Sequence, residues 1–222
     1  MQMPLPVSLH SGDFSFIGDY NSSGYYPAEL SQVYLNASAA HLCADGLEHQ
    51  LKASALLEKT AISVLTLLSL PNYMIPSYWD RVMNMMNGLT AFVTTPGELF
   101  SLFKNRTTDI NEIGAIIHDR GCEYLILVKK AEGFELLNLQ KMQRIQIPNY
   151  PTEIIDPTGM TEAFCGAMLG ELRFSHDPVR AVVRGSVVAS IKGEGSGPFY
   201  PLDAIPGLIE ARFARIKDWV KV

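Results

Sequence analysis

The part of the sequence best suited to chemistry is a tight turn that leads into a helix. The turn reads Asp156-Pro157-Thr158-Gly159, and the helical pattern begins directly after it. The first turn of a helix has backbone N–H groups without partners and carries the positive end of the helix dipole. Such a turn can bind an anion such as phosphate. Glu162 lies in this first turn, where its carboxylate could take a proton from an attacking hydroxyl.

A plainer interpretation of the same residues stays open. An acidic side chain in the first turn of a capped helix is common, because it stabilises the helix dipole. From the residues alone, Glu162 is either a proton acceptor beside an anion site or a carboxylate that stabilises its own helix.

The cysteines and histidines predict neither a metal site nor a disulfide framework. Cys43, Cys122 and Cys165 are widely spaced and form no C-x-x-C pair, and the five histidines form no H-x-x-x-H or H-x-H pair. Each cysteine has apolar neighbours, so we expect each one to pack as a small apolar side chain.

The elements that must position Glu162 begin with alternating strands and helices. Short apolar runs predict strands at 33–35, 62–68, 89–93 and 124–128. Helical spacing predicts helices at 44–59, 76–86, 96–103 and 110–120. Strands that alternate with helices in this way are typical of an α/β protein with a mainly parallel sheet covered on both faces.

The pattern changes after residue 128. An antiparallel pair is predicted at 134–139 and 142–147, and three helices follow at about 160–173, 178–191 and 203–220. Small residues at 163, 166, 167 and 170 predict that the first of these helices approaches its neighbours closely. Residues 1–30 are rich in Ser, Gly, Tyr and Pro, so we expect an arm or loop there and a single α/β domain over 31–222.

Composition excludes several classes of protein. The 222 residues are 47% apolar and 18% charged, which is enough for a core and too apolar for a disordered chain. A net charge of -5 without a Lys/Arg cluster argues against nucleic acid as a partner. The longest apolar run, 62–70, is interrupted by polar residues, and residues 1–9 lack a basic region, so we expect no membrane span and no signal peptide. We therefore expect a cytoplasmic protein without membrane partners.

The segment Asp156–Phe164 (DPTGMTEAF) resembles the D-[PT]-T-G-A-G-D-A-F signature of the PfkB/ribokinase family of carbohydrate kinases. Four other segments resemble family motifs in the same order. Residues 65–80 resemble the family's strand and D-P-x-x-R/M…W segment, and residues 89–98 resemble its strand followed by N-x-x-E. Residues 122–133 resemble its strand that ends in V-K-x-G-x-x-G, and residues 185–198 resemble the late helix and loop beside the adenine pocket. The resemblance starts at about residue 33. It implies a three-layer ribokinase-like fold that lacks the usual N-terminal part, which carries much of the sugar-binding surface.

The resemblance also implies an activity, namely transfer of the ATP γ-phosphate to a hydroxyl of a sugar or nucleoside, with ATP and Mg²⁺ as cofactors. Glu162 would be the catalytic base, and Gly159, Met160 and Thr161 would form the turn that holds the transferring phosphate. Glu98 would be the metal-linked acid. The residues expected to border the nucleotide are Lys129, Gly133, Gly193, Gly195 and Gly197.

Several site positions depart from the family pattern. The family's Ala-Gly-Asp is Met160-Thr161-Glu162, so the carboxylate arm is one methylene longer, and a positional error near 1 Å can cost about a hundredfold in rate. Thr95 replaces the Asn of N-x-x-E, Ala131 replaces the first Gly of G-x-x-G, and Leu67 or Ser69 stands near the earlier family Asp.

These departures leave alternatives to a working kinase. One is a catalytically inactive kinase-like protein that acts in binding or assembly. The missing N-terminal strands would leave a sheet edge for a partner or a second copy to cover, so a homodimer is one arrangement this hypothesis allows. Another is an α/β binding domain with an accidental match to the signature.

Overall fold

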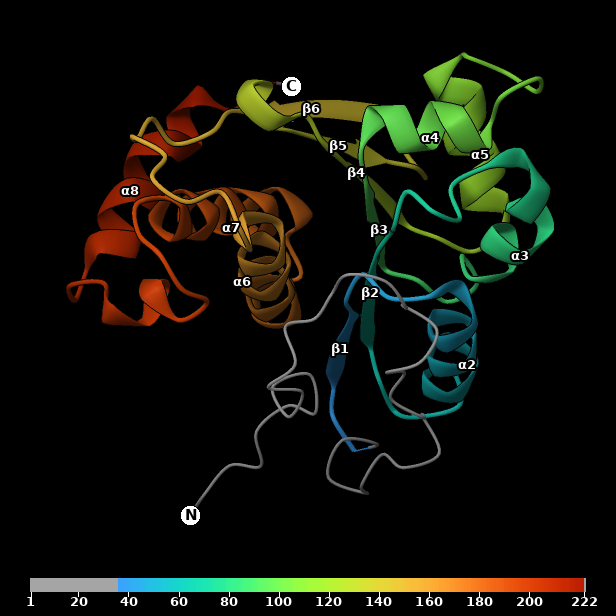
Figure 1. Cartoon of the computed structure of the whole chain (residues 1–222), viewed down its shortest axis with the longest axis horizontal. Coiled ribbons are helices and arrows are strands. Elements are labelled where there is room, and N and C mark those ends of the chain that lie inside the picture. Colours follow the sequence, from blue (N-terminus) through green and yellow to red (C-terminus); the bar gives the residue numbers. More distant parts are fainter. Residues whose placement is uncertain (1–35, 222) are drawn as a thin grey trace.

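The computed structural model describes residues 36–221 of the chain (Figure 1). The predicted arm at 1–30 and the predicted strand at 33–35 lie outside the described residues. The rest forms a three-layer α/β structure, in which one sheet separates two groups of helices. This is the ribokinase-like layering that the sequence predicted.

The sheet has six strands in the order in which they occur along the chain. The first four are parallel to their neighbours, and the last two add an antiparallel hairpin. The strands are β1 (Ala39–Leu42), β2 (Val64–Leu68), β3 (Ala91–Thr94), β4 (Tyr124–Val128), β5 (Phe134–Asn138) and β6 (Gln143–Ile147). The sheet is therefore mainly parallel, as predicted.

The helices lie on the two faces of the sheet (Figure 1). Right-handed crossovers that add strands in one direction place their helices on one face, and α2 to α5 lie together there. After the hairpin, α6 and α7 cover the opposite face, and α8 packs on α7. The helices are α2 (Leu47–Leu57), α3 (Trp79–Asn84), α4 (Pro96–Leu102), α5 (Ile110–Asp119), α6 (Met160–Ser175), α7 (Pro178–Gly193) and α8 (Leu208–Ile216).

Each face of the sheet has its own apolar core, because neighbouring side chains of a strand point to opposite faces. In β2, Leu65 and Leu67 belong to the core under α2 to α5, whereas Val64 and Leu68 belong to the core under α6 and α7. Strands that are apolar on both faces explain the uninterrupted apolar runs in the sequence. Among residues 36–221, no helix has both the length and the apolar character needed to cross a membrane.

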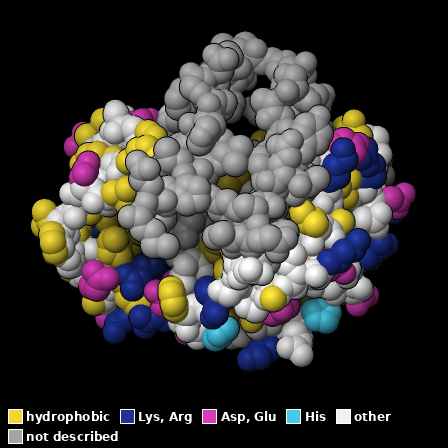
Figure 2. Space-filling view, turned by 90° about the horizontal axis from the view of Figure 1, so that it is seen from below, with side chains coloured by type: hydrophobic (Ala, Val, Ile, Leu, Met, Phe, Trp, Pro, Cys, Tyr) yellow, Lys and Arg dark blue, Asp and Glu magenta, His cyan; other side chains and the backbone are white. Residues whose placement is uncertain are grey.

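The surface mixes charges of both signs. In the view of Figure 2, groups of Lys and Arg side chains lie at the left and right of this face, with Asp, Glu and apolar side chains beside them. The described part of this face therefore carries both signs of charge.

The structure differs most from the sequence prediction at two elements. Strand β1 was not predicted at all. The predicted helix at 203–220 is wrong in extent, because only Leu208–Ile216 is α-helical and short 3-10 turns lie at Tyr200–Asp203 and Lys217–Trp219. Pro206 disfavours helical backbone in the residue before it. Gly207 adopts a left-handed conformation, with φ of 83°, and begins the helix there.

The contact between α6 and α7 depends on a glycine of α7. A Cβ at Gly185 would lie 2.6 Å from Cδ2 of Phe164 and 2.8 Å from the Phe164 carbonyl oxygen. Phe164 in turn stacks on Phe134 of β5, with ring centroids 4.1 Å apart. The prediction that the small residues of α6 make this approach is wrong for Gly166 and Gly170, because no described atom would lie within 4 Å of a Cβ at either.

Alanine substitutions in the two helices should therefore have opposite effects on stability. Gly185→Ala should lower the free energy of unfolding by about 1–3 kcal/mol, because the added methyl group collides with Phe164. Gly166→Ala, the matched control, should raise it by about 0.5–1 kcal/mol through helix propensity alone. Urea unfolding of both variants measures this difference, and equal effects would contradict the described packing of α6 on α7.

Candidate functional site

A small cavity lies where the carboxyl ends of β2, β3 and β4 meet the start of α6. Parallel α/β sheets bind ligands at this edge, because the strands end there and the connecting loops diverge. The cavity has a volume of about 180 Å³. Its lining residues are Ala44, Leu68, Ser69, Leu70, Thr94, Thr95, Glu98, Val128, Thr161 and Glu162.

The turn before α6 has the geometry that the sequence predicted. The Thr158 N–H donates to Oδ1 of Asp156 at 2.9 Å, and Gly159 has a left-handed φ of 79°, which turns the chain into the helix. Met160 packs inward, because its sulfur would lie 3.1 Å from a Cβ placed on Gly193 of α7. The Met160 side chain therefore does not cover the start of the helix.

The first turn of α6 keeps unused hydrogen-bond donors. Within residues 36–221, no group accepts a hydrogen bond from the backbone N–H of Thr161 or Glu162, and no side chain caps the helix. Both residues line the small cavity. The cavity thus meets free amide donors and the positive end of a helix of 16 residues.

A second carboxylate, that of Glu98, is held in place on the opposite side of the cavity. Its Oε2 accepts hydrogen bonds from the Ser69 hydroxyl at 2.5 Å and from the Thr94 hydroxyl at 3.1 Å. Both hydroxyl residues are buried at the ends of neighbouring strands, β2 and β3. Thr95 caps α4 by accepting from the Glu98 N–H at 3.2 Å, which fixes the backbone of Glu98 as well.

Cys43 lies close enough to Glu162 for the carboxylate charge to act on its thiol. Although Cys43 as a residue is exposed, nearby protein atoms partly shield its thiol from water, and this partial burial raises the pKa of Cys43; the negative charge of Glu162 raises it further. Cys43 follows β1, so this strand also brings its carboxyl end to the site. The prediction that each cysteine packs as an apolar side chain is confirmed for Cys122 and Cys165, which are buried, and is wrong for Cys43, which is exposed.

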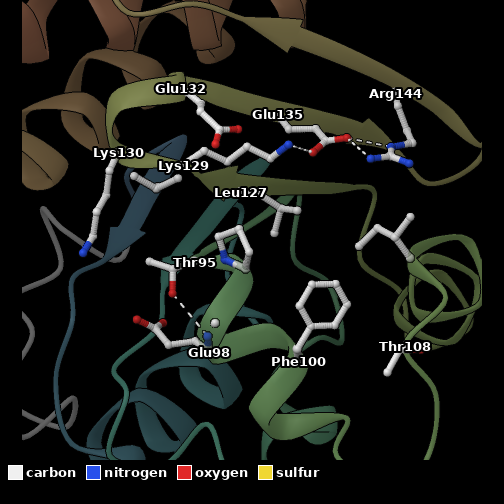
Figure 3. Close-up of a pocket in the computed structure, with 14 residues that line it drawn as sticks. Thr95, Glu98, Phe100, Thr108, Leu127, Lys129, Lys130, Glu132, Glu135 and Arg144 are labelled. Atoms are coloured by element: carbon white, nitrogen blue, oxygen red, sulfur yellow. Dashed lines mark hydrogen bonds and ion pairs between the residues drawn. The ribbon is translucent and has the colours of Figure 1, made fainter.

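A larger cavity of about 740 Å³ adjoins the small one and shares Thr95, Glu98 and Val128 with it (Figure 3). It lies between the start of α4 and the β5–β6 hairpin. Apolar residues, among them Phe100 and Leu127, form part of its wall. The charged residues that line it are Glu98, Lys129, Lys130, Glu132, Glu135 and Arg144.

One buried carboxylate organises the basic wall of this larger cavity. Glu135 of β5 lies between Lys129 and Arg144, at 2.5 Å from Nζ of Lys129 and 2.5 Å from Nη2 of Arg144 (Figure 3). Burial acts to raise the pKa of Glu135, but the hydrogen bonds from Lys129 and Arg144 outweigh burial, so the pKa is lowered. Glu135 therefore stays charged and fixes two cationic groups at the cavity wall.

Comparison with known proteins places this arrangement in a known fold. No protein-family profile matches the chain. A curated relative, the cytidine kinase of Thermococcus kodakarensis, is 23% identical over 145 residues, which are 63% of this chain and 49% of the relative. The nucleoside kinase of Burkholderia thailandensis, solved in complex with ADP-inosine, has a TM-score of 0.67 and 19% identity over 86% of this chain and 56% of its own. Arabidopsis thaliana ribokinase with ribose and ATP has a TM-score of 0.66 and 15% identity over 85% and 61%.

The chain has the ribokinase fold. The resemblance stated from the motifs is thus confirmed at the level of structure, because the solved neighbours include ribokinases and nucleoside kinases. The chain spans about half the length of the curated relative, 63% of a putative ribokinase II from E. coli and 56% of the nucleoside kinase of Methanocaldococcus jannaschii.

The ribokinase fold brings some of the predicted site residues together. Glu162, Thr161 and Glu98 line one cavity, Gly159 forms the turn beside it, and Lys129 lines the adjoining cavity. The residues predicted as catalytic and metal-linked therefore converge on one place, although they are about sixty residues apart in the sequence.

The four glycines predicted at the nucleotide border are not among the residues that line these two cavities. A Cβ at Gly133 would lie 2.3 Å from the Ile147 carbonyl oxygen, and one at Gly195 would lie 2.1 Å from the Tyr200 ring. Gly193 is packed against Met160, as described above, and Gly197 is open with a left-handed φ of 90°. Protein neighbours thus explain three of these glycines, and their nucleotide-binding role stays a prediction.

Sequence reasoning did not assign a role to the hydroxyls that hold Glu98 or to Lys192. Ser69 was noted only as a departure from a family Asp, and Thr94 was not singled out. Both residues could have been found from their position, because Ser69 and Thr94 stand at the carboxyl ends of two adjacent buried strands, where the side chains of parallel strands meet. Lys192 gave no such signal, because it lies within an apolar helical pattern.

The ion pairs of Glu135 with Lys129 and Arg144 make the free energy of unfolding larger at neutral pH than at acid pH. A carboxyl whose pKa is lowered in the folded state stabilises the fold above the ordinary carboxyl pKa, and this stabilisation is lost as the pH falls through the lowered value. Glu135→Gln should therefore lower the free energy of unfolding by about 1–3 kcal/mol near neutral pH, and by progressively less as the solution becomes acid. Guanidinium unfolding over a pH series measures this, with the exposed Glu132→Gln as control. A Glu135→Gln loss that stays constant down to acid pH would contradict it.

The proximity of Cys43 to Glu162 can be tested by alkylation. Glu162→Gln removes a negative charge beside the thiol, so the pKa of Cys43 should fall and its reaction with iodoacetamide at fixed pH should become about two- to tenfold faster. Mass spectrometry follows the rate, and the other two cysteines are buried. Glu153→Gln, which removes an exposed acid before the turn, is the control. Equal rates in the two variants would show that residues 43 and 162 are not neighbours.

Proposed function

We propose that the protein is a kinase of the PfkB/ribokinase type, which transfers the γ-phosphate of ATP to a hydroxyl of a sugar or nucleoside. The observation that carries this proposal is the convergence of Glu162, Thr161 and Glu98 on one cavity at the start of α6. A proton acceptor, free backbone donors and a second, oriented carboxylate are the parts that phosphoryl transfer requires.

Glu162 acts as the general base in this proposal. Its carboxylate lies in the first turn of α6 and accepts the proton of the attacking hydroxyl. The longer arm of Glu compared with Asp moves this carboxylate outward by one methylene, and the substrate hydroxyl must lie correspondingly further from the helix. Support for a free carboxylate comes from its place in the cavity lining and from its effect on the pKa of Cys43.

The backbone N–H groups of Thr161 and Glu162 bind the transferring phosphate. Replacement of the family Gly by Thr161 restricts the backbone, but no group of the described residues accepts from its N–H, so the donor is retained. Met160 packs toward Gly193 and leaves the approach free. Donors fixed by the helix need no reorganisation when negative charge develops on the phosphate oxygens.

Mg²⁺ fits the donor set of this cavity. Proteins usually bind Mg²⁺ through one or two carboxylates, with phosphate and water completing the coordination shell. Glu98, held by two hydroxyls, and Glu162 line the same cavity, while the described residues contain no cluster of three or more metal-ligating side chains. The ion would neutralise negative charge on the phosphates. In support, an E. coli chain of this fold was solved with ATP and Mg²⁺.

ATP is proposed to extend from the small cavity into the larger one. The larger cavity has the size of a small-molecule site, shares Glu98 with the small one, and presents Lys129 and Arg144 on its wall. These cations suit phosphate oxygens, and the apolar wall suits a base or sugar. Nucleosides are the first acceptors to test, because the curated relative is named a cytidine kinase and a solved neighbour holds inosine.

The test is release of ADP from ATP and Mg²⁺ in the presence of a panel of nucleosides and sugars. We expect turnover by the wild type with at least one acceptor. Glu162→Gln should lower it by about a hundredfold or more while the melting temperature stays nearly unchanged, because removing a general base affects the chemical step alone. Glu162→Asp, which restores the family's arm length, should stay active.

The control is Glu153→Gln, which should keep wild-type turnover. A folded wild type that releases no ADP with any acceptor, yet is stabilised by ATP, would overturn the kinase proposal and favour the catalytically inactive, kinase-like alternative. ATP at one hundred times its dissociation constant stabilises a protein by about 2.7 kcal/mol, so binding would be visible in a melting experiment. A wild type that neither releases ADP nor is stabilised by ATP would support neither proposal, and only the ribokinase fold would stand.

A further inference from the structure

A buried lysine lies directly behind the turn that precedes α6. Lys192, near the end of α7, is 1% exposed. Its Nζ lies 3.1 Å from the Gly195 carbonyl oxygen, 3.5 Å from the Asp156 carbonyl oxygen and 3.7 Å from Oδ2 of Asp156. The ammonium group therefore joins the start of the turn at 156–159 to the loop that follows α7.

The side chain of Lys192 also runs along the turn itself. A Cβ placed on Gly159 would lie 3.7 Å from Cε of Lys192, which is ordinary van der Waals contact. Gly159 is the residue from which α6 begins, and the free N–H groups of Thr161 and Glu162 follow it. The ammonium group thus lies on the buried side of the turn. Thr161 and Glu162, which follow the turn, line the small cavity.

Within residues 36–221, the ammonium group of Lys192 has one ion-pair partner, and that partner is partly exposed to water. An ammonium group in a protein interior is costly unless it is paired. The carboxylate of Asp156 is 26% exposed and lies 3.7 Å away, and the other two contacts are carbonyl oxygens. Glu194, the next acid along the chain, is already paired with Arg212 at 2.8 Å. An anion on the far side of the turn would add a second negative charge that attracts the ammonium group.

We propose that Lys192 is the positioning residue of the anion-binding turn. It holds the turn through the Asp156 and Gly195 carbonyl groups, and its charge draws phosphate oxygens to the N–H groups of Thr161 and Glu162. This inference rests on the proposed function and deepens it, because it assigns the charge that selects a phosphate group at this site. No proton or bond changes at Lys192, which acts only through the turn and its electric field.

The experiment separates phosphate recognition from general folding. Calorimetry measures dissociation constants for ATP, inorganic pyrophosphate and adenosine with the wild type, Lys192→Met and Lys192→Arg. Met keeps the length and packing of the side chain and removes the charge, whereas Arg keeps the charge. Lys59→Met, at an exposed position outside both cavities, matches the change in net charge.

Lys192→Met should weaken the binding of ATP and of pyrophosphate about tenfold or more, because it removes a buried unit charge beside the turn that binds the phosphate. Adenosine, which carries no phosphate, should bind as it does to the wild type. Lys192→Arg should keep most of the pyrophosphate affinity, and Lys59→Met should keep all of it. Pyrophosphate bound equally well by Lys192→Met and the wild type, or adenosine weakened as much as pyrophosphate, would overturn the inference.

Asp156→Asn provides the test if Lys192→Met does not fold. Asn keeps the Oδ1 acceptor used by the Thr158 N–H and removes the carboxylate that lies 3.7 Å from the ammonium group. Pyrophosphate should then bind more tightly than to the wild type, and unchanged or weaker binding would overturn the inference. A wild type that binds neither ATP nor pyrophosphate would refute the proposed function itself. A wild type that binds both, together with an unaffected Lys192→Met, would refute only the role of Lys192.

Discussion

The attachment of one turn to the end of one helix is the constraint on which the site depends. The Gly193 carbonyl oxygen accepts hydrogen bonds from the N–H of Ile155 at 2.7 Å and from the N–H of Asp156 at 3.1 Å. These bonds fix the chain just before α6 begins, and the absence of a side chain at Gly193 allows Met160 and Ile154 to pack against its backbone. If this junction moved, the free N–H groups of α6 would no longer face the carboxylate of Glu98.

The opposite side of the site is fixed by different means. Glu98 begins a helix on the other face of the sheet, and its carboxylate is held by hydroxyls from two strands. Strands, unlike loops, are rigidly spaced by the sheet, so the distance between this carboxylate and the start of α6 is set by the three-layer packing itself. The two apolar cores therefore contribute to function as well as to stability, because each core carries one side of the small cavity.

The sequence predicted most of the fold, because strands buried on both faces appear as short apolar runs and two of the helices between them, α4 and α5, begin after capping residues. Strand β1 was missed because Ala39-Ala40-His41-Leu42 has two small residues and a polar one, and only its pairing with β2 makes it a strand. The broken helix after residue 203 was missed because amphipathic spacing continues across Pro206 and Gly207.

Prediction of the site was uneven for a physical reason. Glu162, Thr161 and Glu98 could be named because they stand in local motifs. The Ser69 hydroxyl and the lysine behind the turn could not, because Ser69 lies 29 residues from Glu98 and Lys192 lies 36 residues from Asp156, so that only packing brings each pair together. The glycines 193 and 195 suggested a ligand, yet protein atoms fill the space beside them.

The exposure of Cys43 has a practical consequence. The sequence contains three cysteines, of which two are buried, so this thiol is a unique attachment point, and it lies near enough to Glu162 for that charge to raise its pKa. Disulfide-tethered fragments could be anchored there without any engineered residue, and each captured fragment would sample the space next to Glu162. The raised pKa of the thiol sets the condition for such screening, which should be run at alkaline pH, where more of the thiolate is present.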